Sequence, residues 1–188
     1  MTIALLNLEQ RVFNQQSLIP PQLDLLWKIE HGIVRTVTWN EIGTKSTLGY
    51  WGVQDVVGQP LSRIAPYKIE CLTSVKVTAV PTSLWHHLLE PVVLHGQQVE
   101  QLLSIVHRDR IQLRLLELLT WLAQKFGRPI EQGTLIDLPL THQQLAETIS
   151  TTRVTVTRLL EQLEQTGLIW RIRRRIVLLS NRDQTLSA

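Results

Sequence analysis

The sequence has a single cysteine, Cys71, among its 188 residues. One thiol cannot form a disulfide within the chain, nor can cysteines alone hold a zinc ion or an iron–sulfur cluster. The N-terminal stretch, Met1–Arg11, lacks the basic and then apolar order of a signal peptide. No uninterrupted apolar run approaches the roughly 20 residues that cross a bilayer. We therefore expect a reducing, cytoplasmic location and no contact with membranes.

The sequence also lacks the patterns of an enzyme or a cofactor-binding protein. No nucleophile–base pair, phosphate-binding loop or carboxylate pair stands out. The histidines at His86-His87 and His95 do not have metal-ligand spacing, and haem has no better support. No catalytic residue, metal or cofactor is expected.

Positive charge is concentrated at the C-terminal end of the chain. The net charge is +3, and residues 139–188 account for it with seven arginines, no lysine and four acidic residues. The planar guanidinium of arginine suits phosphates and the edge of guanine. This pattern favours nucleic acid as a partner, although a solvated basic tail would have the same composition.

Residues 1–85 are predicted to be mainly β. Runs such as Ile33–Trp39 alternate apolar and polar residues and are rich in β-branched types. Cys71–Val80 is predicted as the final strand. Several glycines are predicted to mark hairpin turns: Gly32, Gly43, Gly49, Gly52 and Gly58.

Helices are predicted to follow. A short helix runs from Thr82 to Leu89, and Pro91 opens a longer one that extends to about His107. Asp109 is predicted to cap the next helix, which ends at Gly127.

The helix that begins at Pro91 has a narrow stripe at three- and four-residue spacing. The stripe consists of Val92, His95, Val99, Leu102 and Val106. Two interpretations stay open, namely contact between the helices of two chains and packing of the helix on its own domain.

Residues 140–169 have the layout of a helix-turn-helix. Thr141 is predicted to cap a helix from about His142 to Ile149, and Ser150–Thr152 forms a turn that caps a second helix. The second helix has a buried stripe that consists of Val156, Leu159, Leu160 and Leu163.

The opposite face of the second helix is predicted to be exposed. It presents Val154 and Arg158, flanked by Thr157 and Glu161, with Arg153 in the first turn. A valine between two arginines suits the thymine methyl group and the guanine edge in a major groove of DNA.

Gly167 is predicted to end this helix, and two strands follow. They surround Arg173, Arg174 and Arg175, which are predicted to lie along phosphates as the tip of a wing. A charged turn that only maintains solubility is the alternative.

The segments Thr141–Glu147 and Thr152–Ile169 resemble the CRP/FNR family of bacterial transcription regulators. Thr152–Leu160 is especially similar to the cyanobacterial global nitrogen regulators within that family. The resemblance implies that Arg153, Val154 and Arg158 read bases, with Thr157 beside them. It implies DNA-backbone contacts from a second group, which consists of Thr141, His142, Gln143, Thr152 and Thr155.

The likeness extends into the first half of the chain, where the family's ligand motifs are missing. Cyclic-nucleotide-binding members have glutamate at the position of Gln59 and a phosphate-binding arginine at the position of Ile69. Val93 and Gln98 stand where the nitrogen regulators have an arginine and a glutamate for 2-oxoglutarate. The resemblance therefore implies a degenerate sensor that binds another ligand, a partner protein or nothing.

Together these features predict an α+β protein. Residues 1–90 would form a short β-roll like that of cyclic-nucleotide-binding domains, residues 91–108 a dimerisation helix, and residues 109–188 a winged helix-turn-helix. The expected function is that of a homodimeric regulator on palindromic double-stranded DNA, with RNA polymerase or another protein as a further partner. The alternative is an adaptor that contacts proteins and has no preferred DNA sequence.

Overall fold

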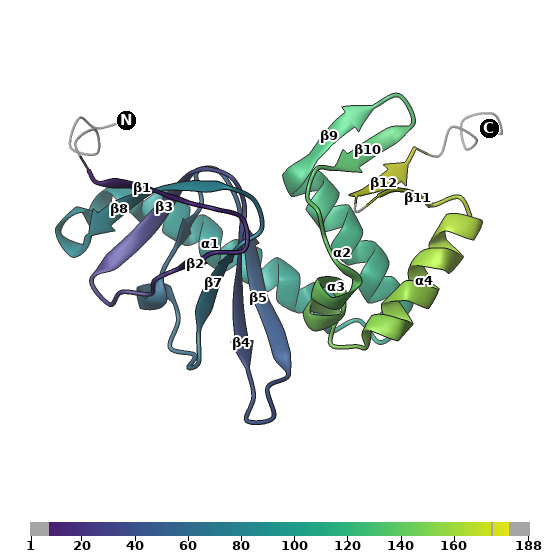
Figure 1. Ribbon diagram of the computed structural model, residues 1–188, viewed down its shortest axis with the longest axis horizontal. Helices are drawn as coiled ribbons and strands as arrows, with labels where there is room; N and C mark the ends of the chain where they lie inside the picture. The colour runs from purple at the N-terminus through teal and green to yellow at the C-terminus, as the bar shows by residue number, and fades with distance from the viewer. Residues whose placement is uncertain (1–7, 174, 181–188) are drawn as a thin grey trace. The chain divides into compact units, whose positions relative to one another are not determined.

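The computed structural model describes residues 8–173 and 175–180. The chain divides between Leu103 and Ser104 into two compact units. The first unit runs from purple to teal in Figure 1, and the second from teal to yellow. The division falls within a long helix, whereas the sequence suggested boundaries after residues 90 and 108.

Antiparallel sheets form most of the first unit. One sheet has the strand order β1-β8-β3-β6 and the other β2-β7-β4-β5. The strands are β1 (Gln10–Phe13), β2 (Leu18–Ile19), β3 (Leu25–His31), β4 (Val34–Trp39), β5 (Lys45–Trp51), β6 (Val56–Val57), β7 (Lys68–Cys71) and β8 (Val75–Pro81). Short 3-10 helices follow β6 and β8, namely η2 (Gln59–Leu61) and η3 (Thr82–Leu88).

The start of the chain supplies a strand to each sheet. In one sheet β1 pairs with β8, with Gln10 opposite Thr78, and in the other β2 pairs with β7, with Leu18 opposite Glu70. The sequence pattern predicted no particular element here. Strands this short carry too few residues for alternation to be recognised.

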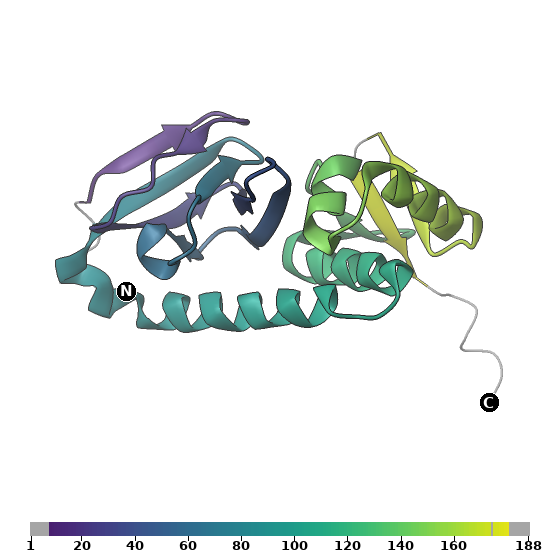
Figure 2. The ribbon, with the colours of Figure 1, turned by 90° about the horizontal axis from the view of Figure 1, so that it is seen from below.

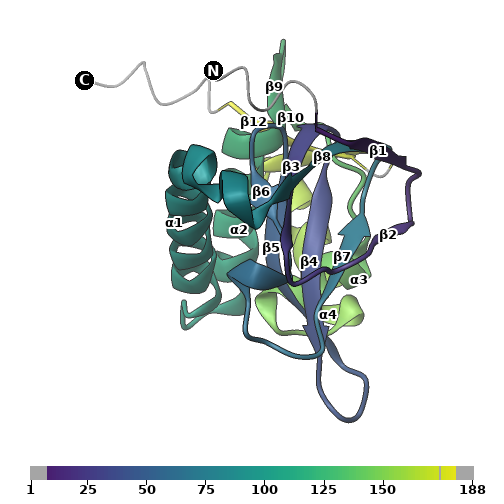
Figure 3. The same ribbon diagram turned by 90° about the vertical axis from the view of Figure 1, so that its left-hand side faces the viewer.

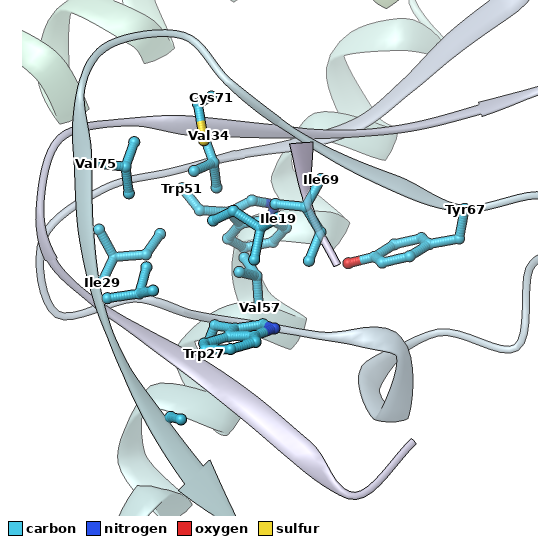
Figure 4. Packing of buried hydrophobic residues seen from close by; sticks show 12 residues of the cluster. Ile19, Trp27, Ile29, Val34, Trp51, Val57, Tyr67, Ile69, Cys71 and Val75 are labelled. Carbon is cyan, nitrogen blue, oxygen red and sulfur yellow. The ribbon is translucent and has the colours of Figure 1, made fainter. Parts of the chain in front are cut away.

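The core of the first unit lies between the two sheets (Figure 4). Trp27 and Ile29 from β3 pack in one cluster with Val34 of β4 and Ile69 of β7, and all four side chains are fully buried. Trp51 joins the same cluster, and its indole N–H donates to Thr36 Oγ1 at 3.0 Å. The β-roll interior is therefore packed with large apolar and aromatic side chains.

Two of the predicted glycine turns are confirmed and one is wrong. Gly32 and Gly43 have φ angles of +86° and +80° at the turns that follow β3 and β4. Gly49 lies inside β5 instead. A Cβ atom there would lie 2.3 Å from the ring of Trp51, so only glycine leaves enough space for this ring.

A long helix, α1 (Leu89–Val106), follows η3 and contains the division between the units. It is uninterrupted in Figure 2 and lies beside the strands of the first unit in Figure 3. The predicted start at Pro91 is wrong by two residues. Proline is tolerated throughout the first turn of a helix and therefore does not by itself mark the first residue.

The second unit combines three helices with an antiparallel sheet. The helices are α2 (Ile111–Phe126), α3 (His142–Ile149) and α4 (Arg153–Gln165). The strands are β9 (Gly127–Ile130), β10 (Gly133–Ile136), β11 (Ile169–Ile172) and β12 (Arg175–Leu179), in the order β11-β12-β10-β9. Leu115, Leu118, Leu119 and Leu122 of α2 are fully buried.

Two further predictions are corrected. Cys71–Val80 is not one strand, because β7 ends at Cys71 and β8 begins at Val75. Asp109 does not cap α2. Arg110 occupies the N-cap position without a side-chain cap, because the backbone turns helical one residue later than predicted.

Candidate DNA interface

The first helix of the helix-turn-helix begins where the sequence predicted. Thr141 Oγ1 accepts a hydrogen bond from the Gln144 amide at 3.1 Å, and Gln144 Oε1 accepts one from the Thr141 amide at 2.9 Å. This reciprocal capping box satisfies two amide donors that have no partner within the helix. The start of α3 is therefore fixed by local hydrogen bonds.

The turn and the second cap also follow the predicted pattern. Ser150 adopts the left-handed conformation, with φ of 56°, and this reverses the chain after α3. Thr152 Oγ1 accepts from the Thr155 amide at 3.1 Å, and the two threonine hydroxyls lie 2.9 Å apart. Thr152 and Thr155 therefore form the N-terminal cap of α4.

The two faces of α4 are as different as predicted. Val156, Leu160 and Leu163 are fully buried and Leu159 is 6% exposed. On the other side Val154 is 78% exposed, and Arg153 and Arg158 are exposed as well. Burial of one stripe thus directs a valine and two arginines into solvent.

Thr157 differs from these exposed residues, because its hydroxyl is bonded within the chain. Thr157 Oγ1 donates to the Arg153 carbonyl at 3.0 Å and lies 2.7 Å from His142 Nδ1. The structure therefore brings together His142, predicted to contact the DNA backbone, and Thr157, predicted to lie beside the base-reading residues. Their contact links α3 to α4.

The end of α4 is tied to the wing through residues that sequence reasoning missed. Gly167, with φ of +68°, closes the helix, and the Leu168 amide donates to the Leu163 carbonyl at 3.0 Å. Glu164 accepts from the Arg171 amide at 3.1 Å and from Arg171 Nε at 2.8 Å. These hydrogen bonds keep the pKa of Glu164 below its usual value. The acid and the arginine are seven positions apart on different elements, so helical periodicity could not pair them.

The predicted wing is a hairpin of β11 and β12, with Ile169 opposite Leu178. Arg173 is exposed at its turn with φ of 56°. Arg174 lies outside the described residues. Arg175 was predicted to lie along phosphates, but it forms an ion pair within the chain instead, with its Nη2 3.0 Å from Asp137 Oδ1.

A hollow of about 490 Å³ brings together residues from three elements of the second unit. Its lining consists of Leu140, Thr141, His142, Gln143, Arg153 and Arg173. Five of these were predicted from sequence as DNA contacts, and the structure now places them around one cavity.

His142 has a lowered pKa. Partial burial disfavours the imidazolium, and the positive charges of Arg171 and Arg153 act in the same direction. Glu161 opposes them, but the pKa of His142 still lies below its usual value. The free protein therefore favours the neutral imidazole.

The predicted stripe on α1 is divided between two environments. His95 stacks on Trp51 with ring centroids 3.9 Å apart, and Val92 packs on a core cluster of its own unit. Leu102 is 4% exposed, whereas Val99 is 39% exposed. His95 and Leu102 are thus buried or in contact within one chain, and the contact between two chains stays a prediction.

The two departures from the cyclic-nucleotide motif have structural roles of their own. Gln59 Nε2 donates to the Ser62 carbonyl at 2.9 Å. Ile69 is fully buried in the β-roll core. Neither side chain offers a positive charge to a phosphate.

The described part of the chain has neither a membrane-spanning helix nor a group of metal ligands. Within residues 8–173 and 175–180, no helix is long and apolar enough to cross a membrane. Over the same residues, no three histidine, cysteine or acidic side chains are grouped as metal ligands would be.

Comparison with known proteins identifies the family. Residues 113–184 match the model of the Crp-like helix-turn-helix domain. The regulatory protein CysR of Synechococcus elongatus is 42% identical over 170 residues, which cover 88% of this chain and 82% of that protein. The chain belongs to the CRP/FNR family of transcription regulators.

Other relatives of this CRP/FNR regulator agree. The global nitrogen regulator of Synechococcus elongatus is 43% identical over 115 residues, which cover 55% of this chain and 51% of that protein. A CRP-family regulator from Thermus thermophilus has the same fold, with a TM-score of 0.78 at 22% identity over 90% of this chain and 92% of the other. The expected β-roll, long helix and winged helix-turn-helix are thereby confirmed.

Replacement of Thr141 by alanine is expected to destabilise the protein by about 1 kcal/mol, because α3 loses a capping hydrogen bond at its first turn. Urea unfolding followed by circular dichroism, without DNA, measures the change. Thr120→Ala is the matched control, since Thr120 is exposed within α2 and its hydroxyl only donates to the Leu116 carbonyl of its own helix. A Thr141→Ala loss no larger than that of the control would contradict the structural role of the cap.

Proposed function

We propose that this CRP/FNR regulator acts as a homodimer on a palindromic DNA site. Each subunit would insert α4 into a major groove, and the two grooves would lie about 34–36 Å apart. Contact with RNA polymerase or another protein is expected once the regulator is bound.

The exposed face of α4 carries the proposal. Val154 and Arg158 project one turn apart from a helix whose opposite face is buried. In a major groove the valine would contact a thymine methyl group, and arginine would bond to guanine O6 and N7. Arg153, at the first turn, completes a face that combines apolar and guanidinium groups.

Phosphate contacts would add affinity that does not depend on sequence. Arg173 is exposed at the wing turn and lines the same hollow as Arg153. Because Arg175 lies beside Asp137, Arg173 is the better candidate for a phosphate contact among the described arginines of the wing. Hydrogen bonds to phosphate fix the position of a protein on DNA but carry no sequence information directly.

Dimerisation is proposed to use the exposed apolar side of α1. Steps of three and four residues connect its members, which are Leu89, Val93, Gly96, Val99 and Leu103. Leu89 is 70% and Leu103 is 54% exposed, whereas Leu102 and Ile105 on the other side are buried. The proposed dimer contact therefore lies on a side of α1 that is rotated about the helix axis toward Val93 and Leu103. Val99 is a member of both this set and the stripe predicted from sequence.

We further propose that the β-roll does not respond to cyclic AMP. An anionic phosphate buried without a positive partner is costly, and Ile69 occupies the position where the family has its arginine. Side chains of α1 also contact the roll. Gln98 Nε2 donates to Asp55 Oδ1 at 2.9 Å, and His95 Nδ1 donates to the Val56 carbonyl at 3.0 Å. These contacts support a helix that is positioned without an effector.

The test of base reading begins with selection of a preferred site from random DNA. Arg158→Ala is then expected to cost about 1–3 kcal/mol per half-site and to relax the preference at one base pair of each half-site, because each subunit loses a bidentate contact to guanine. Fluorescence anisotropy on selected and scrambled DNA measures both effects.

Arg173→Ala is the matched control for a phosphate contact. It should weaken both DNAs similarly and reduce the steepness of log K against log salt by about one unit per subunit. Equal losses on selected and scrambled DNA for Arg158→Ala would contradict base reading, and the absence of any preferred sequence would favour an adaptor.

Leu103→Lys is expected to dissociate the dimer, because it places a charge in the apolar contact between two α1 helices. Sedimentation velocity at micromolar concentration distinguishes dimer from monomer. Leu94→Lys is the matched control, since Leu94 is a half-exposed leucine that projects from the opposite side of α1 at about 100° per residue. A Leu103→Lys protein that sediments as a dimer would place the interface elsewhere.

Addition of cyclic AMP or 2-oxoglutarate is expected to leave DNA affinity unchanged, because the β-roll lacks the family's side chains for either ligand. Isothermal titration of each compound should give no heat of binding. Micromolar affinity for either one would contradict the proposal of a degenerate sensor.

A further inference from the structure

The hollow beside α3 has the composition of an anion site that contains a titratable group. Arg153 comes from α4, Arg173 from the wing and His142 from α3. Among the described residues that line the hollow, none is acidic. If the proposed function holds, the anion that enters this hollow is a phosphate of the DNA backbone.

The hydrogen bonds around Thr157 determine which nitrogen of His142 carries a proton. A threonine hydroxyl has one proton, and that of Thr157 is directed to the Arg153 carbonyl at 3.0 Å. The hydroxyl oxygen must therefore accept from His142 Nδ1, which lies 2.7 Å away. Nδ1 keeps its proton, and Nε2 is the atom that gains or loses one.

Partial burial and the charges that face His142 favour the neutral ring in the free protein. Arg153 on α4 and Arg171 on β11 disfavour a second positive charge, and Glu161 on α4 favours it. Arg173 of the wing lines the same hollow. Partial burial adds to the effect of the arginines, and together these keep the pKa of His142 below its usual value.

Entry of a phosphate would reverse this balance. A nearby anion stabilises the imidazolium, and the proton gained at Nε2 is a donor for a charge-assisted hydrogen bond to a phosphate oxygen. We propose that DNA binding is accompanied by the uptake of one proton from solvent at His142 Nε2. This inference rests on the proposed function, because DNA supplies the phosphate.

The sign of the pH dependence follows from proton linkage. The complex holds more protons than the separate molecules, so a lower pH favours the complex. The dependence is confined to the range between the lowered pKa of the free protein and the higher pKa of the complex. Below that range both states are protonated, and the affinity becomes independent of pH.

The experiment measures affinity for the selected site at pH 6, 7 and 8 at constant salt. We expect binding to be about three- to tenfold tighter at pH 6 than at pH 8. Isothermal titration in two buffers with different ionisation enthalpies should detect uptake of up to about one proton per bound subunit near pH 7.

Three variants assign the proton to His142. His142→Gln cannot be protonated and should bind with little dependence on pH. His142→Arg keeps a positive charge throughout, so it should bind at pH 8 as tightly as at pH 6. His31→Gln is the control, since His31 is an exposed histidine of the first unit and its replacement should preserve the wild-type pH dependence.

Two results would overturn the inference alone. One is specific binding by the wild type with equal affinity at pH 6 and pH 8 and no proton uptake. The other is a His142→Gln protein that retains the wild-type pH dependence. Failure of the wild type to prefer any DNA sequence would instead overturn the proposed function, and the inference with it.

Discussion

Burial of the leucine and valine stripe of α4 is the constraint on which the rest of the second unit depends. Val156, Leu159, Leu160 and Leu163 enter the core, and this fixes the rotation of the helix about its axis. Val154 and Arg158 are then exposed because no other orientation buries the stripe. The caps at Thr141 and Thr152 fix where each helix starts, and Glu164 connects its end to Arg171. Apolar packing on one side of α4 thus determines the direction in which Val154 and Arg158 project, although neither residue takes part in that packing.

Much of this second unit could be predicted from sequence because its signals are local. A capping threonine, a buried stripe and a terminal glycine each act within one or two helical turns. The bonds between elements could not be predicted, since no periodicity relates His142 to Thr157 or Arg175 to Asp137. These pairs arise only when α3 meets α4 and when β12 approaches the end of β10. They also engage the Thr157 hydroxyl and the Arg175 guanidinium, which sequence alone assigned to DNA.

The first unit and α1 were harder to predict for a related reason. Short strands such as β1 and β2 become strands through pairing with β8 and β7, which lie far away in the sequence. On α1, apolar spacing identified a stripe but not which side of it meets the β-roll. Stacking of His95 on Trp51 decides that question, and it depends on the space that Gly49 leaves for the indole ring. A histidine in an apolar stripe was therefore part of the roll's own packing.

The contacts from α1 to the β-roll have a consequence for how such a regulator would respond in a cell. In the proposed effector-independent sensor, Gln98 and His95 already hold α1 against the β-roll, so a small molecule would have little effect on the position of the helix. Occupancy of a promoter would then follow the amount of protein present. If the proposed homodimer has to form before a palindrome is bound, occupancy would rise more steeply than the concentration of the chain. Promoter occupancy would then depend on the rates at which the protein is made and degraded, and not on the concentration of a metabolite.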